Sequence, residues 1–284
     1  MTAAEVPTEM PAAQRLDLRR VEVDDVLDRV QAALGVRLDF VGSVRKRRSI
    51  GARTESGTWV RVECRGLDRP LEQGWGIEAA SGISGVPMPA WHQGVSWLDV
   101  ERGVRWRADE TDLVAGNPIG KPLVALELPA TWWTALGLAM DALSAHDTYR
   151  RATPDLELAT ESRFAAAIAK VFPDVDATVE TWSTAHADFN WPNLTGPTFE
   201  VFDWEDFGTA PRGLDAATLW FGSLRLPELA DKVTACLRAD LESRDGKLMQ
   251  LWRCAEFLAW ATDEEPGYDA VTESVARLAR ELKS

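Results

Sequence analysis

The chain has 284 residues, of which 45% are hydrophobic, so it can bury at least one large core, and its length lies between those of one long domain and two. Its formal charge of -14, from 45 acidic and 31 basic residues, argues against a nucleic-acid partner, because phosphate contacts need a concentrated positive surface. The 3 cysteines lack metal-site spacing, and no segment has signal-peptide or membrane-spanning character. We therefore predict a cytoplasmic protein without a nucleic-acid or membrane partner.

The N-terminal part of the chain has the alternating pattern of antiparallel strands. In TWVRVEC, Val60 and Val62 lie on one face of a strand and Arg61 lies on the other, and the turn before this strand is Glu55-Ser56-Gly57. The first twenty or so residues, rich in Ala, Pro and charge, are expected to be a loosely held start. The predicted strands are 36–40, 58–64, 95–100 and 104–108, and one helix is expected between 71 and 81.

Beyond the turn-forming run GNPIG, which starts at Gly116, apolar residues recur at helical spacing. The first of these helices begins at Thr131, a suitable N-cap, and ends near His146. The predicted helices are 131–146, 164–171, 229–237, 248–258 and 271–282. We therefore predict an α+β, bilobal fold with an antiparallel-sheet N-terminal lobe, 1–115, and a mainly helical C-terminal lobe, 116–284.

The segment HADFNWPN, followed by the apolar stretch TFEVFDW, contains the candidate catalytic and metal-binding residues. Phosphoryl transfer from ATP needs a carboxylate that orients a hydroxyl and takes its proton, and oxygen ligands that hold Mg²⁺ on the phosphates. Asp188 is the candidate base, and Asn193 and Asp203, the latter at the end of an expected strand, are the candidate metal ligands. Asp188 and Asn193 alone would also fit ordinary loop capping, so their spacing to Asp203 and Asp215 supports the functional interpretation.

This pattern resembles the aminoglycoside phosphotransferase and choline-kinase-like branch of the protein-kinase-like fold. In that family the catalytic loop reads H-G-D-x-x-x-x-N, and the next strand ends in the metal-binding Asp of a D-W or D-F pair. Here the loop is H-A-D-F-N-W-P-N, with Ala187 in place of the glycine, and Asp203-Trp204 follows. In APRGLDAATLW, Asp215 matches the family's Asp that steadies the catalytic loop, and ALSAHDT resembles the end of the helix that precedes the insert before it.

The resemblance implies roles for further residues. His186 would brace the catalytic loop by hydrogen bonds. The fold also expects a basic residue on its third strand, which holds the α- and β-phosphates, and a Glu partner on the following helix. Arg61 is the first candidate for the basic residue, Arg65 is the second, and Glu78 is the candidate partner, although an exposed helix glutamate is the alternative reading.

Two features depart from the family pattern. No G-x-G-x-x-G stands between the first two strands, and in its place the chain reads GSVRKRRSIG, which begins with Gly42 and Ser43. This stretch is either a phosphate-covering loop that binds the nucleotide or a solvated turn. Ala187 is less free than glycine to adopt a positive φ, which weakens the inference of activity without excluding it.

Three residues near the motif are candidates for binding the substrate. Glu205 and Asp206 follow the metal-binding Asp and are suited to an amine, or they cap the next turn or face solvent. Trp191 offers an indole ring for stacking on a substrate or a cation, or it packs in the core. The negative charge of the chain by itself indicates a cationic substrate only weakly.

The predicted function is a Mg²⁺-dependent phosphotransferase that moves the γ-phosphate of ATP or GTP to a hydroxyl of a small molecule, such as an aminoglycoside, an amino alcohol or a sugar. The N-terminal lobe would bind the nucleotide, and the C-terminal lobe would hold the catalytic and substrate residues. The alternative is a catalytically weak nucleotide-binding or regulatory kinase-like protein, which the missing glycine loop and Ala187 favour. A protein kinase ranks last, because the interval between Asp203 and Asp215 is too short for a peptide-docking activation segment.

Overall fold

The structure is a computed structural model that describes residues 16–67, 75–124 and 126–282. The chain divides into two compact units, one of Met1–Gly74 with Ala90–Leu113 and one of Trp75–Pro89 with Val114–Ser284. Residues 75–89, which the sequence analysis assigned to the N-terminal lobe, are therefore grouped with the helical unit. The division into functional lobes at residue 115 stays a prediction. The expectations for residues 1–15 and for the start of the helix at 71–74 lie outside the described residues.

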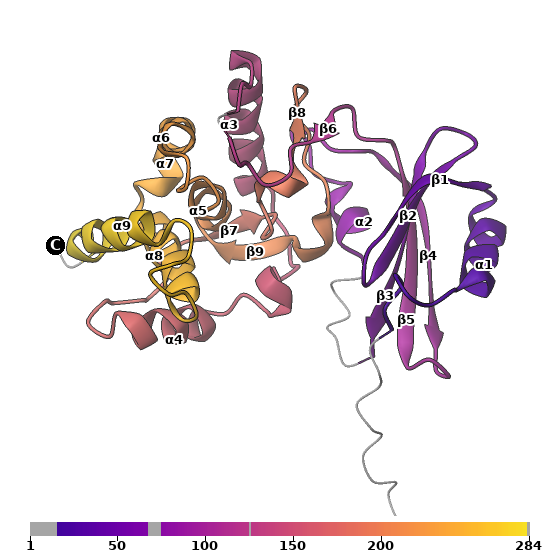
Figure 1. Ribbon diagram of the computed structural model, residues 1–284, viewed down its shortest axis with the longest axis horizontal. Coiled ribbons are helices and arrows are strands. Elements are labelled where there is room, and N and C mark those ends of the chain that lie inside the picture. Colours follow the sequence, from indigo (N-terminus) through magenta and orange to yellow (C-terminus); the bar gives the residue numbers. More distant parts are fainter. Residues whose placement is uncertain (1–15, 68–74, 125, 283–284) are drawn as a thin grey trace, which may run out of the picture. The chain divides into compact units, whose positions relative to one another are not determined.

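The first unit is a five-stranded antiparallel sheet with the strand order β1-β2-β3-β5-β4 (Figure 1). Val60 and Val62 are each 1% exposed, as the alternation in TWVRVEC predicted. The turn between β2 and β3 is also confirmed, since the Gly57 N–H donates to the carbonyl of Thr54 at 3.0 Å. The strands are β1 (Leu38–Arg45), β2 (Ser49–Thr54), β3 (Trp59–Gly66), β4 (Trp91–Asp99) and β5 (Val104–Thr111).

One helix of this unit, α1 (Asp24–Leu34), was not predicted. It covers the apolar face of the sheet (Figure 1), and its buried residues share a core with Val60 and Val62. These buried residues, Val26, Leu27, Val30 and Leu34, recur at helical spacing, so the signal was present in the sequence. The opposite face of the sheet carries charged side chains.

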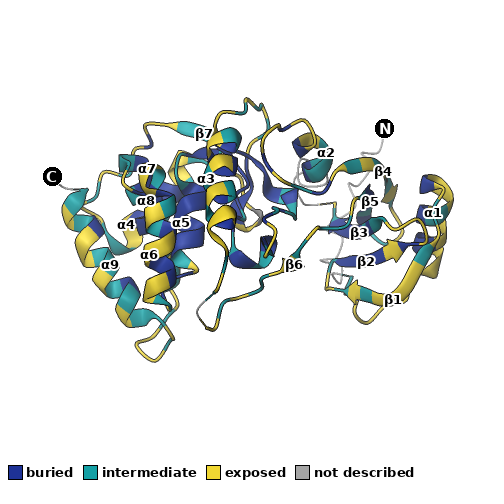
Figure 2. Cartoon of the chain, turned by 90° about the horizontal axis from the view of Figure 1, so that it is seen from above, coloured by how far each residue is buried: buried dark blue, intermediate teal, exposed yellow. Residues whose placement is uncertain are grey.

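The second unit is mainly helical. Figure 2 shows helices α5 and α8 as largely buried, and they form the centre of this unit. Its helices are α2 (Gly76–Ala80), α3 (Ala130–Ser144), α4 (Glu161–Val171), α5 (Leu214–Phe221), α6 (Pro227–Cys236), α7 (Arg238–Leu241), α8 (Arg244–Leu258) and α9 (Tyr268–Glu281). The five helices predicted from the sequence between 131 and 282 thus correspond to α3, α4, α6, α8 and α9.

Short strands and 3-10 helices connect these helices. Two antiparallel strand pairs are present: β6 (Asn117–Pro118) with β8 (Thr195–Gly196), and β7 (Trp182–Ala185) with β9 (Gly208–Pro211). The 3-10 helices of the candidate site are η2 (Pro154–Leu156), η3 (Trp191–Asn193) and η4 (Trp204–Asp206).

The strand predicted at 198–203 is wrong, because this segment makes a single β-bridge, from Val201 to Leu194. Its amides donate to separate partners rather than to one neighbouring strand. The N–H of Val201 bonds the carbonyl of Pro87 at 2.9 Å, and the N–H of Phe202 bonds the carbonyl of Asn193 at 3.1 Å.

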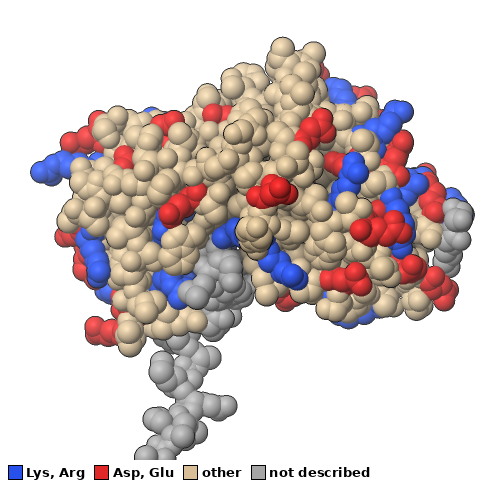
Figure 3. All heavy atoms as spheres, turned by 180° about the vertical axis from the view of Figure 1, so that it is seen from behind, with Lys and Arg blue, Asp and Glu red and all other residues tan. Residues whose placement is uncertain are grey.

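Two surface properties bear on partners. On the face shown in Figure 3, acidic and basic side chains are interspersed, so the acidic excess is not gathered into one patch there. Within the described ranges, no helix is long and apolar enough to cross a bilayer.

Helix α8 lies close to the start of α5 and to α7 at two glycines. A Cβ on Gly213 would lie 2.6 Å from the Cα of Gly246, and a Cβ on Gly246 would lie 1.8 Å from the carbonyl oxygen of Asp240. Gly213 also has a φ of +82°, which glycine adopts without strain. This close approach fixes the start of α5, the helix that carries Asp215.

We expect Gly246→Ala to lower the free energy of unfolding by about 1–3 kcal/mol or more, because the new methyl group overlaps backbone atoms that cannot move aside. Gly137→Ala, within helix α3, is the matched control. Its Cβ would meet nothing closer than the sulfur of Cys236 at 3.8 Å, so this change should raise stability by about 0.5–1 kcal/mol. Urea unfolding of both variants tests the packing, and an unchanged midpoint for Gly246→Ala would contradict it.

Candidate active site

The carboxylate of Asp215, in the first turn of α5, holds the start of the HADFNWPN loop. Asp215 is 3% exposed and accepts the backbone N–H of His186 at 2.6 Å and that of Ala187 at 2.8 Å. Burial raises the pKa of Asp215 to about 7, although the two N–H donors lower it, and the charges of Asp240 and Asp188 raise it further. A double hydrogen bond from buried amides of this kind fixes the backbone that leads to Asp188.

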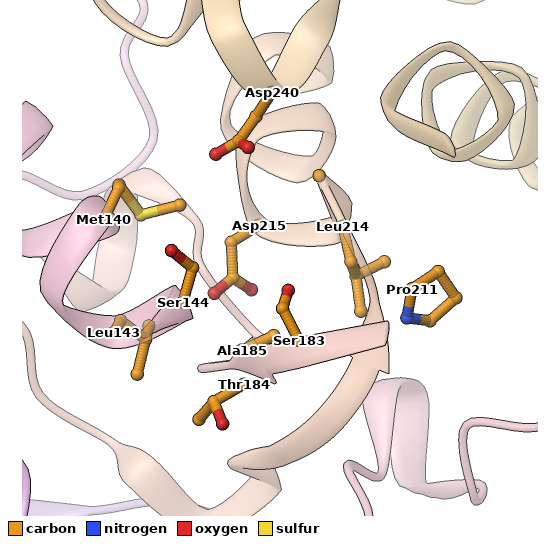
Figure 4. Close-up of a pocket in the computed structure, with 11 residues that line it drawn as sticks. Met140, Leu143, Ser144, Ser183, Thr184, Ala185, Pro211, Leu214, Asp215 and Asp240 are labelled. Carbon is orange, nitrogen blue, oxygen red and sulfur yellow. The ribbon is translucent and has the colours of Figure 1, made fainter. Parts of the chain in front are cut away.

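Asp215 also borders a small cavity, together with Asp240, Ser144 and Ser183 (Figure 4). The cavity has a volume of about 10 Å³, which is room for about one water molecule. It is therefore too small to be the site of a nucleotide or of an acceptor.

His186 links the loop to the segment that ends in Asp203. Its Nδ1 accepts the N–H of Asp188 at 3.3 Å, so its Nε2 carries the proton and donates to the carbonyl of Phe202 at 3.1 Å. Burial lowers the pKa of His186 to about 4, which keeps the ring neutral near pH 7 and suits this tautomer. The contacts are those of a brace, the role that the resemblance implied.

Asp188 lies between two amide side chains of its own loop. The Nδ2 of Asn193 donates to Oδ2 of Asp188 at 2.8 Å and to its carbonyl at 2.9 Å, and the Nδ2 of Asn190 donates to Oδ1 at 2.6 Å. Burial, followed by the charge of Asp203, raises the pKa of Asp188 to about 6. The sequence analysis missed Asn190, although its place two residues after Asp188 in the motif was a usable signal.

Two of the predicted positions have left-handed backbone. Ala187 and Asp203 each have a φ of 68°, and within the described residues Asp155, at 53°, is the third non-glycine residue with positive φ. Such a conformation costs an L-residue about 1–2 kcal/mol, and it persists where the surroundings hold it in place. Ala187 therefore adopts a conformation that glycine would take without strain.

The donor atoms of Asn193 and Asp203 fit a magnesium ion that is shared with phosphates. Mg²⁺ in nucleotide sites takes one or two protein oxygens, and water and phosphate oxygens complete its shell. The Nδ2 of Asn193 is bonded to Asp188, so Oδ1 is the atom of its side chain that could bind a metal. The ranges that the structure describes contain no group of three or more His, Cys, Asp or Glu side chains suited to a metal, so an all-protein metal cage does not fit.

The candidate substrate residues divide into two groups. The charge of Glu205, like that of Asp155, helps to raise the pKa of Asp188, so both carboxylates are near the base. The structure places the side chains of Asp206 and Trp191 in the interior. Asp206 is 5% exposed and accepts a hydrogen bond from Oγ1 of Thr153 at 2.6 Å, and Trp191 is 1% exposed. Helices η4 and η3 turn these two side chains inward, and substrate binding by them stays a prediction.

The sheet unit holds the other predicted residues. Arg61 pairs with Glu63 at 3.3 Å, and its side chain is 32% exposed, whereas Arg65 pairs with Glu63 at 2.8 Å and is 4% exposed. Arg61 is thus the more accessible of the two candidates. Glu78 lies on α2, in the helical unit, so its proposed pairing with Arg61 joins residues of different units and stays a prediction.

The segment 42–51, considered as a phosphate loop, is mostly strand. Gly42 and Ser43 lie at a bulge in β1, where the pairing with β2 shifts register, and Gly42 supplies a φ of +75°. The connection to β2 is a tight turn, closed by the N–H of Lys46 and the carbonyl of Ser49 at 2.8 Å. Of the two alternatives left open for this stretch, a phosphate-covering loop and a solvated turn, the structure shows a tight turn after residue 45, and nucleotide binding by Gly42 and Ser43 stays a prediction.

Solved structures share the fold of this chain. Aminoglycoside phosphotransferase APH(4)-Ia is 14% identical with a TM-score of 0.59, and the match covers 92% of this chain and 97% of that one. Amicoumacin kinase hAmiN, in complex with AMP-PNP, Ca²⁺ and Ami, is 12% identical with a TM-score of 0.54. The match covers 93% of this chain and 94% of that one. Spectinomycin phosphotransferase APH(9)-Ia, in complex with ADP and spectinomycin, is 12% identical with a TM-score of 0.52. The match covers 93% of this chain and 99% of that one.

No protein-family model matches the sequence, and no curated protein matches it either. At these identities the structural likeness concerns the fold. The predicted protein-kinase-like fold, with an antiparallel-sheet unit and a mainly helical unit, is confirmed.

We expect Asp215→Asn to destabilise the protein by about 1–3 kcal/mol, because its NH₂ group would face one of the two N–H donors. Ionising a buried acid whose folded pKa is raised from 3.8 to about 7 lowers stability as pH rises through that interval. The loss caused by Asp215→Asn should therefore be larger at about pH 4 than at about pH 8.

Asp240→Asn is the matched control for this experiment, since Asp240 borders the same cavity but pairs with Arg212 at 2.9 Å near the surface. It should cost about 0–1 kcal/mol. Equal losses for the two variants in chemical unfolding would show that the loop does not depend on Asp215.

Proposed function

We propose that the chain is a Mg²⁺-dependent phosphotransferase that moves the γ-phosphate of ATP or GTP to a hydroxyl of a small molecule. One observation carries the proposal: Asp188 accepts a hydrogen bond from Asn193, and the charge of Asp203 acts on the same carboxylate. A base and two hard oxygen ligands thus meet within one unit. The fold shared with amicoumacin kinase and the aminoglycoside phosphotransferases supports this reading.

The residues of this chain divide the reaction between them. Asp188 would accept a hydrogen bond from the acceptor hydroxyl and take its proton as the new O–P bond forms, while the bond from the γ-phosphorus to the β–γ bridging oxygen breaks and ADP or GDP leaves. Asn193 orients Asp188 through its NH₂ group and offers Oδ1 to the metal, while Asp203 offers a carboxylate oxygen. Magnesium, when bound, neutralises charge on the phosphates. Asp215 and His186 keep the loop rigid, so the acceptor meets a base that is already in position.

The acceptor that we propose carries an amine close to its reactive hydroxyl, as an aminoglycoside or an amino alcohol does. Glu205 and Asp155 place negative charge near Asp188, and Asp155, whose side chain is 55% exposed, also pairs with Arg253 at 3.3 Å and with Arg163 at 3.8 Å. A cationic group would be attracted to these carboxylates. A neutral sugar is the alternative acceptor.

A catalytically weak nucleotide-binding protein is the second candidate. The tight turn between β1 and β2 favours it, since no glycine-rich loop is present to cover phosphates. Ala187 no longer favours it, because its backbone takes the left-handed conformation despite the methyl group.

Saturating ATP or GTP with Mg²⁺ should raise the melting temperature, because a ligand that binds only the folded state adds to stability, by about 2.7 kcal/mol at a hundred times Kd. A thermal-shift assay with each purine nucleotide, with and without Mg²⁺, tests this. No shift with any of them at millimolar concentration would count against both candidate functions.

Asp188→Asn should leave MgATP affinity nearly unchanged and lower turnover roughly 10²- to 10⁴-fold, the usual effect of losing a general base. Asp203→Asn should instead weaken the Mg²⁺-dependent part of nucleotide binding. Asp263→Asn, an exposed acid in the loop before α9, is the control. Calorimetric titration of MgATP, and turnover on a panel of aminoglycosides, amino alcohols and sugars, separate the two roles. Wild-type turnover by Asp188→Asn would show that Asp188 is no base.

Arg61→Ala should weaken nucleotide binding while the protein stays folded, because Arg61 is the accessible cation of its strand. Arg65→Ala should mainly destabilise the sheet, by about 1–3 kcal/mol, since it removes the buried partner of Glu63 and leaves only the longer contact with Arg61. Arg20→Ala, whose side chain is 81% exposed, is the control. Unchanged affinity for ATP in Arg61→Ala would mean that another group clamps the phosphates.

A further inference from the structure

We propose that the segment 75–89 positions the carboxylate of Asp203, because it contacts the chain on both sides of this residue. Gly76 is the positioning residue at one of these contacts. The proposal rests on the metal-ligand role proposed above for Asp203, and it adds what sets the geometry of that ligand.

Asp203 needs such support because its backbone is strained. With φ at 68° and ψ at 55°, it stands in the left-handed region as the residue before η4. Strained residues of this kind revert to ordinary backbone angles unless neighbouring contacts over-determine them. Contacts immediately before and after Asp203 must therefore hold its backbone in this conformation.

After Asp203, the backbone of α2 lies directly on that of η4. A Cβ on Gly76 would be 2.0 Å from the carbonyl oxygen of Trp204 and 2.6 Å from the Cα of Glu205. Gly76 does not have a positive φ, so its own conformation does not demand glycine. Glycine is needed here because the two backbones touch.

Before Asp203, the same segment makes a main-chain hydrogen bond. The carbonyl of Pro87 accepts the N–H of Val201 at 2.9 Å. Between the two contacts the segment is anchored in the core that contains Trp204, by Ala80, Ile83 and Val86. The segment thus forms a brace whose two ends reach residues 201 and 204–205.

Other contacts also hold this loop: residue 202 is bonded to His186 and Asn193, as described above, and further bonds lie beyond Asp203. Arg150 donates to the carbonyl of Glu205 at 2.6 Å and to that of Phe207, and the N–H of Thr153 donates to the carbonyl of Asp206 at 3.0 Å. These bonds hold the far end of η4. A displacement of α2 would therefore act on the end of η4 that adjoins Asp203.

Gly76→Ala tests the inference, because its methyl group must push α2 and residues 204–205 apart. We expect the variant to bind ATP without Mg²⁺ as the parent does, and to need about tenfold more Mg²⁺ for the metal-dependent gain in affinity. Gly82→Ala, in the same segment, is the matched control, since its Cβ would meet nothing within 4 Å. Calorimetry with ATP and increasing Mg²⁺ measures both, and a wild-type Mg²⁺ dependence in Gly76→Ala would overturn the proposal.

A ligand-free measurement separates this proposal from the proposed function. If the unaltered protein binds no MgATP, the proposed function fails, and the brace is then judged from urea unfolding of Gly76→Ala, Asp203→Gly and the double variant. Asp203→Gly releases the left-handed strain, so its effect should differ between the two backgrounds if α2 holds that strain in place. Additive effects would overturn the brace.

If Gly76→Ala does not fold, hydrogen exchange of the unaltered protein tests whether the segment 75–89 holds residues 204–207. The amides of 76–81 and 204–207 should then open with the same free energy, as parts of one cooperative unit. Independent opening of the two segments would overturn the proposal.

Discussion

The candidate site depends on one interaction, the pair of hydrogen bonds that the Asp215 carboxylate accepts from the amides of His186 and Ala187. A carboxylate buried to this degree is costly, and it is tolerated because both oxygens are satisfied by donors that have no other role. The glycine contact between α5 and α8 places the helix that carries Asp215, so the core of the helical unit directly determines where the loop begins. The position of the loop from His186 to Asn193 therefore depends on where Asp215 holds its first two residues.

Two strained residues, Ala187 and Asp203, are connected through the neutral ring of His186. The ring receives a hydrogen bond from the residue after Ala187 and donates one to the residue before Asp203. A neutral imidazole suits this position, because each ring nitrogen must have one fixed function and a second proton would break the contact to Asp188. The loop and the metal-side segment are thereby held as one piece, and strain is stored where the chemistry is proposed to occur.

The sheet unit shows a different way of placing charge. On the face away from α1, Arg107 pairs with Asp109, and a Cβ on Gly94 of the neighbouring strand would lie 2.3 Å from the guanidinium of Arg107. Glu63 is likewise shared by Arg61 and Arg65. A row of paired charges on a sheet face costs desolvation and contributes little net stability. It stands in a chain whose first hairpin has a tight basic turn where kinase-like proteins have a glycine loop.

The sequence by itself determined the class of fold and the members of the candidate catalytic loop. Strand alternation and helical periodicity are local properties, and Asp188, Asn193 and Asp203 belong to a motif with fixed spacing, so no tertiary information was needed to find them. Only the tertiary structure decided which side chains near the motif face inward. Trp191 and Asp206 are adjacent to functional positions in sequence, but short 3-10 turns direct them into the core. The grouping of 75–89 with the helical unit, and the need for glycine at Gly76, depend on contacts between residues more than a hundred positions apart, which no local pattern encodes.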